Sequence, residues 1–278
     1  MVTEAETVAA DRAAGSRVGA AGVALFWAAP FFGIIDLMVA ITPSVFPEFT
    51  DYMVLETSWG LLFTCLIPMP LLAWAVRPVG WVGPQVLAIA GCLLVAGVAG
   101  LALGQVFVAV IMVAGSVSFP RMWRPPPRWA VPRSDPSSAW RAVTAPLFWP
   151  VGAAVFAGVG MAAVHAWRVL DGVSNAEDDN TWGLMHGPMQ AGFALAVPVA
   201  AGVAVLAMAN ALAGWWFAVI PPAVSAVWFG AVSVRYPDLV GSPGEVGGLL
   251  AICWGGSVAA LTFGTGWLRR RRASAATS

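Results

Sequence analysis

The chain has 278 residues, of which 59% are hydrophobic and only 10% are charged, and its 14 arginines balance its 14 acids to a formal net charge of zero. Soluble domains carry roughly 25% charged residues, so this composition excludes a soluble globular domain. Several apolar runs reach the roughly 20 residues that a helix needs to cross the hydrocarbon of a bilayer. The sequence therefore predicts an all-α integral membrane protein whose main partner is the lipid bilayer, and not a barrel of alternating strands.

In chain order, the predicted elements begin with a polar cytoplasmic tail, residues 1–17, which lacks the apolar core of a signal peptide. Eight apolar stretches between charged or proline-rich breaks are then expected to span the membrane: 18–42, 57–76, 81–99, 102–119, 145–167, 187–209, 213–234 and 246–268. They form two four-helix halves, residues 18–119 and 145–268. An arginine- and proline-rich cytoplasmic loop, residues 120–144, separates the halves, and a basic cytoplasmic tail, residues 269–278, follows them.

Proline-containing clusters fall at 67–70 and 220–222, and Pro198 lies within the sixth predicted span. We expect them to interrupt the second, sixth and seventh helices, because proline has no N–H to donate and clashes with the preceding turn. Broken helices line transport sites in many carriers, whereas isolated prolines are also common in ordinary membrane helices.

The distribution of arginine predicts the orientation. With eight spans and an inner amino terminus, every arginine except Arg168 and Arg235 lies on the cytoplasmic side, as the positive-inside rule requires. Most acids, Glu56 among them, then fall in or beside the outer loops. We therefore expect a multi-pass protein of the plasma membrane with both termini in the cytoplasm.

Two short motifs recur in the two predicted halves. ALFWAAP opens the first span and PLFWPVG opens the fifth, while TSWGLLF opens the second and NTWGLMH opens the sixth. This predicts a four-plus-four internal repeat with both halves in the same orientation, in which Trp59 corresponds to Trp182. Chance similarity in a biased composition is the alternative.

The two histidines of the chain, His165 and His186, lie at the facing ends of consecutive predicted helices. Met161 shares a helix face with His165, and Met189 shares one with His186. Imidazole and thioether groups are ligands for copper and for haem iron, so these four residues are a candidate metal or cofactor site. In the alternative interpretation both imidazoles sit at the level of the lipid headgroups with their nitrogens in water.

Asp36 is the only acid inside a predicted span. A carboxylate inside the membrane normally faces the helix bundle and has a partner, which makes Asp36 a candidate substrate or ion site. Gln85, Gln105 and Gln190 are candidate partners from other helices. Because Asp36 lies toward the outer edge of its helix, a structural role in contact with water is the alternative.

Catalytic signatures are absent from the sequence. It has no lysine for a Schiff base, no HExxH motif and no phosphate-binding loop, and its three cysteines lie in apolar runs, as buried small hydrophobic residues do. These features favour a non-enzymatic carrier of a small molecule or an ion, without a nucleic-acid partner. The alternatives are a haem- or copper-binding redox or metal-handling subunit that uses His165 and His186, and an accessory subunit without a site of its own.

Overall fold

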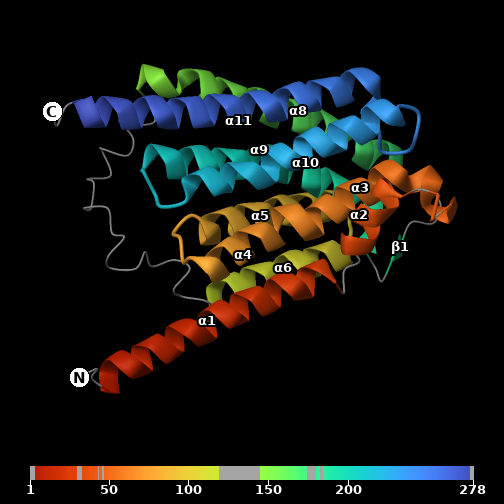
Figure 1. The fold of residues 1–278 in the computed structure, drawn as a ribbon. Helices are drawn as coiled ribbons and strands as arrows, with labels where there is room; N and C mark the ends of the chain where they lie inside the picture. The colour runs from red at the N-terminus through yellow and green to blue at the C-terminus, as the bar shows by residue number, and fades with distance from the viewer. Residues whose placement is uncertain are drawn as a thin grey trace.

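The computed structural model describes residues 4–29, 33–42, 44–45, 47–118, 145–173, 180–181 and 184–275. In these residues the chain is a bundle of helices that run back and forth along one common direction (Figure 1). The predicted all-α class is confirmed. The described residues add a small hairpin of two strands with two residues each. The predicted loop 120–144 and Trp182 of the proposed repeat lie outside the described residues.

The first predicted span, residues 18–42, is two helices and not one. α1 (Glu4–Ala28) and α2 (Gly33–Ile41) meet at a bend of 54°. The sequence between them contains Pro30, and proline disfavours a helical conformation for the residue before it. The first candidate span is therefore a broken one.

The second span is longer than predicted and changes its winding midway. The 3₁₀ turn η1 (Pro47–Tyr52) leads into α3 (Met53–Leu61), the π-helical segment η2 (Leu62–Leu66) and α4 (Pro68–Val76). The N–H of Ile67 donates to the carbonyl of Leu62 at 3.1 Å, which is the wider i to i−5 pattern. The helix widens just before Pro68 and Pro70, which cannot make the usual i to i−4 bonds.

The remaining elements follow the predicted order. They are α5 (Val82–Ala99), α6 (Leu103–Ser118), the 3₁₀ turn η5 (Pro146–Phe148), α8 (Trp149–Val173), the antiparallel strands β1 (Asn180–Thr181) and β2 (Leu184–Met185), α9 (His186–Ala209), α10 (Trp215–Arg235) and α11 (Gly244–Ala275). α9 continues through Pro198 and α10 through Pro221 and Pro222. The expectation that prolines interrupt the sixth and seventh helices was therefore wrong. Of the three sites named, only the cluster at 67–70 coincides with a change of winding, from η2 to α4.

Six helical segments of the described chain are long and apolar enough to cross a membrane, and the α1–α2 pair would be a seventh. These segments are Phe49–Val76, Val82–Ala99, Pro146–Gly172, His186–Ala209, Trp215–Arg235 and Gly244–Arg271. α6 is apolar but shorter than a full span. The structure thus supports a polytopic membrane protein, while the count of eight spans and the internal repeat stay predictions.

The helices are stacked in layers, with α8 and α11 at one edge, α9 and α10 next to them, then α3 to α5, and α1 and α6 at the opposite edge (Figure 1). α9 packs extensively on α5 and α8 and also contacts α3 and α10, so its surface is the most buried of the six candidate spans. α8 and α11 are the least buried. Their exposed apolar faces are the surfaces expected to meet lipid.

Arginine side chains close helix ends at one end of the bundle. Arg17 of α1 donates to the carbonyls of Ala75 and Val76 at the end of α4, and Arg269 of α11 donates to two carbonyls at the end of α9. A cation is stabilised there because a helix carries partial negative charge at its carboxyl end. The start of α1 and the end of α11 lie at this same end of the bundle (Figure 1).

Candidate functional site

A buried polar cluster joins three elements at the end of the bundle opposite the termini. It consists of Asp36 on α2, Glu56 on α3 and His186 at the start of α9, and all three side chains are buried. The carboxyl groups of Asp36 and Glu56 lie close enough to each other to interact directly. The Nε2 atom of His186 lies 3.5 Å from Oε1 of Glu56. Glu56 is therefore the central member of the Asp36–Glu56–His186 cluster.

Two glycines explain why α2 approaches α3 and η2 so closely. A Cβ atom on Gly60 would lie 2.6 Å from the backbone nitrogen of Leu37, and one on Gly33 would lie 2.6 Å from the Cβ of Phe63. Neither position has room for a side chain. Glu56 precedes Gly60 by four residues and shares its helix face, so this contact also turns Glu56 toward Asp36.

His186 is held by the elements on either side of it. The β1–β2 hairpin ends directly before it, Met185 has an extended backbone, and α9 begins with His186 itself. The imidazole packs on Trp59 with ring centroids 4.7 Å apart. Since Trp59 lies three residues after Glu56 on α3, both side chains contact the same imidazole, and its position relative to Glu56 is fixed.

The cluster is suited to holding a proton. Two carboxyl groups can share a hydrogen bond only when one of them is protonated, and two like charges at such a distance resist simultaneous ionisation. The neighbouring hydroxyls of Thr57 and Ser58 donate to backbone carbonyls of their own helix, so neither hydroxyl donates its hydrogen bond to the carboxyl groups. Among the described residues, no group of three or more His, Cys, Asp or Glu side chains is arranged to hold a metal ion.

Sequence reasoning identified Asp36 and His186 but missed Glu56. The second span was expected to begin at residue 57, which left Glu56 in the outer loop, whereas α3 begins at Met53 and buries Glu56. The available signal was the apolar triplet Met53–Leu55 before it, together with a glycine one turn later. The burial itself depends on α2 and α9, which no local pattern on α3 reveals.

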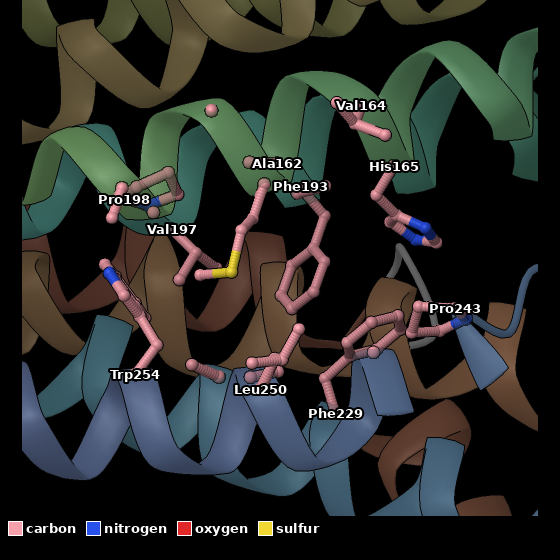
Figure 2. Close-up of a pocket in the computed structure, with 18 of the residues that line it drawn as sticks. Ala162, Val164, His165, Phe193, Val197, Pro198, Phe229, Pro243, Leu250 and Trp254 are labelled. Atoms are coloured by element: carbon pink, nitrogen blue, oxygen red, sulfur yellow. The ribbon is translucent and has the colours of Figure 1, made fainter. Parts of the chain in front are cut away.

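His165 and Met161 lie elsewhere, in a cavity of about 630 Å³ between α8, α9, α10 and α11. Figure 2 shows the imidazole of His165 directed from α8 toward Phe229 and Pro243, with Phe193 beside them. The rings of His165 and Phe229 have centroids 5.7 Å apart. The Nε2 atom of His165 is buried and has no hydrogen-bond partner among the described residues.

The four residues of the predicted copper or haem site thus have different surroundings. His186 contacts Glu56 and Trp59, and Met189 is buried in the apolar core. His165 and Met161 line the cavity, and neither His186 nor Met189 does. The structure pairs each histidine with aromatic rings and not with the other histidine, so the chain gives the haem or copper hypothesis no support beyond the sequence pattern.

The three glutamines lie between helices, where their amide nitrogens donate to backbone carbonyls. Gln85 of α5 donates to Ala200 and Ala218 at 3.3 and 3.1 Å. Gln105 of α6 donates to Leu93 and Pro188, and Gln190 of α9 donates to Gly241. These bonds connect α5, α6, α9 and the α10–α11 turn, so the glutamines link helices and none of them contacts Asp36 through a bond recorded in the structure.

Gln85 also explains how α10 tolerates a proline. The carbonyl of Ala218 would normally accept from residue 222, but Pro222 has no N–H. The Gln85 amide donates to that carbonyl instead. A polar side chain of a distant helix thus satisfies a backbone group that would otherwise be orphaned in an apolar interior, where an unmade hydrogen bond is costly.

No protein-family model matches the chain, and comparisons with curated proteins and with solved structures give no match either.

The hydrogen bond from Gln85 to the carbonyl of Ala218 predicts that Gln85 and Pro222 contribute to stability in a coupled way. Gln85→Leu should lower the free energy of unfolding by about 1–3 kcal/mol, because two backbone carbonyls lose a buried donor. In a Pro222→Ala background the loss should be smaller, since the new N–H of residue 222 serves the carbonyl of Ala218. Unfolding of the four proteins in detergent measures the coupling, and Val95→Ala on the exposed face of α5 is the control. Equal losses in both backgrounds would contradict this role of Gln85.

Proposed function

We propose that the chain is a proton-coupled membrane carrier and that the Asp36–Glu56–His186 cluster is its proton-binding site. The observation that supports the proposal is the burial of two neighbouring carboxyl groups beside an imidazole, between three helical segments. Acids and histidines within membrane segments are costly, and chains of them are typical of proton relays in pumps and transporters.

Two features of the backbone support movement of a proton or solute at this cluster. Asp36 lies on α2, the short half of a span that is broken by a 54° bend, and discontinuous helices are typical of carrier binding sites. Glu56 lies on α3, one to two turns before the π-helical segment η2, and π-segments occur frequently at functional sites. The cluster therefore joins the two helices of the bundle whose winding or direction changes.

Loading and release of a proton would change the charge balance of the three groups. When a proton is shared between Asp36 and Glu56, the pair carries one negative charge, which a protonated His186 at 3.5 Å can neutralise. Loss of the shared proton leaves two adjacent carboxylates, which repel each other across the close α2–α3 contact. This repulsion favours separation of α2 from α3. It would therefore couple the release of a proton to a change in the conformation of the protein.

Reconstituted vesicles test the proposal. Solutes of different classes, including amino acids, sugars, nucleobases, organic cations and metal ions, are added outside vesicles that contain a lumenal pH dye. At least one class should acidify or alkalise the lumen with wild-type protein. Asp36→Asn and Glu56→Gln should reduce that signal to the leak of protein-free vesicles, because neither amide exchanges a proton.

Glu245→Gln is the matched control, since Glu245 is an exposed acid at the start of α11. It should retain the wild-type signal, and all variants should elute and melt as the wild type does. If no solute class changes the lumenal pH with correctly folded wild-type protein, the carrier proposal is wrong and the accessory-subunit alternative is favoured.

We further propose that eight helical segments cross the plasma membrane and that both termini are cytoplasmic. The arginines that close α4 and α9 support this orientation, because they gather basic groups at the end of the bundle that holds both termini. In a cysteine-free background, a membrane-impermeant maleimide should label a cysteine at the exposed Asp238 in intact cells but not one at Ala275. The reverse labelling would contradict the orientation.

A further inference from the structure

The cavity between α8 and α11 opens toward the surface that meets lipid. Met161, Val164, Val246 and Leu250 line it and are also exposed on the outside of the bundle. α8 and α11 contact each other much less than α8 contacts α9 or α11 contacts α10. A molecule dissolved in the bilayer can therefore enter sideways between the two edge helices, without passing through water.

The cavity is elongated along the helices and closed at its deep end. Its lining on α8 extends from Ala157 to Arg168, which corresponds to roughly 16 Å at 1.5 Å per residue. At the deep end the indole of Trp254 donates to the carbonyl of Ala154 at 2.7 Å and packs directly on Gly158, where a Cβ atom would overlap the ring. Trp254 is thus fixed as the floor of the cavity (Figure 2).

Polar groups are confined to the other end, near the α8–α9 connection. Arg168 lies one turn after His165, and both line the cavity. None of the lining residues is acidic. The remaining wall is apolar and aromatic, with Phe193 and Phe229 facing the space between α8 and α11 (Figure 2). The site therefore offers one cation at its polar end, beside the imidazole of His165 and next to an apolar slot.

We propose that this cavity binds a single acyl chain that carries an anionic headgroup. The headgroup, a carboxylate or a phosphate, is bound by the Arg168 guanidinium. The acyl chain lies along α8 down to Trp254. This arrangement places the charge toward the end of the span and the chain toward its middle, which is how a lipid lies in a bilayer. A cavity of about 630 Å³ is within the range of small-molecule sites.

The inference does not rest on the proposed carrier function, because no residue of the Asp36–Glu56–His186 cluster lines the cavity. Its test also uses a different readout. Lipid binding can be found in a protein that moves no protons, and it can be absent from a protein that carries them.

Photo-crosslinking with palmitic acid that carries a diazirine on its chain tests the site. The full chain in phosphatidylcholine vesicles is irradiated with this probe or with the corresponding fatty alcohol, and the adducts are mapped by mass spectrometry. The acid should label mainly the cavity-lining parts of α8 and α11, between Ala157 and Arg168 and between Val246 and Trp254. Labelling spread evenly over all lipid-facing helices would overturn the proposal.

Two neighbouring alanines of α8 supply a matched pair of variants. Ala162 lines the cavity and Ala163 is exposed outside it. Ala162→Phe should reduce cavity labelling by about tenfold, whereas Ala163→Phe, which adds the same ring to the lipid-facing side, should leave it unchanged. Equal labelling of the two variants would overturn the proposal.

The headgroup is tested separately, so that a folding defect in Ala162→Phe does not decide the outcome. Arg168→Gln should weaken labelling by the acid about tenfold and leave labelling by the alcohol unchanged, because only the acid loses a charge-assisted bond. Competition by unlabelled palmitate identifies a carboxylate head, and competition by lysophosphatidylglycerol, which has one acyl chain, identifies a phosphate head. If the acid and the alcohol label the wild type and Arg168→Gln alike, headgroup recognition by Arg168 is wrong.

Discussion

The polar interior of this protein depends on the contact between Gly60 of α3 and the backbone of α2. In an apolar bundle a buried carboxyl group is tolerated only beside a partner, and Asp36 reaches Glu56 because the two helices touch without an intervening side chain. His186 then completes the cluster from the first residue of α9. One close helix contact thus determines where protons can reside in the proposed carrier.

The same constraint, that every buried polar group needs a partner inside the protein, explains the middle of the bundle. Pro222 leaves the carbonyl of Ala218 without its helical donor, and Gln85 supplies one from α5. α10 therefore stays continuous, while η2 widens before Pro68. Some buried polar atoms of the described residues depart from this rule, among them Oε1 of Gln85 and Nε2 of His165, which have no hydrogen-bond partner there. His165 is the one of them that lines the cavity.

Composition and apolar runs were sufficient to predict the membrane class, the order of the helices and the burial of Asp36, because each depends on local hydrophobicity. The continuity of helices could not be predicted in this way. At Pro222 of α10 a distant side chain, Gln85, supplies the bond that the proline cannot, and no local pattern on α10 reveals this. The environment of Glu56 was missed for a similar reason, since its burial comes from α2 and α9. Spacing along one helix also could not show that His165 and His186 face different neighbours.

Infrared difference spectroscopy of the purified protein tests the central claim, that Asp36 and Glu56 share a proton, most directly. At neutral pH the wild type should show the carbonyl stretch of a protonated, hydrogen-bonded carboxyl group, and Glu245→Gln should retain it. Asp36→Asn and Glu56→Gln should each lose that band, and Gly60→Val, which separates α2 from α3, should shift or remove it. A wild-type spectrum without a protonated carboxyl, or a band that persists unchanged in both Asp36→Asn and Glu56→Gln, would contradict the account.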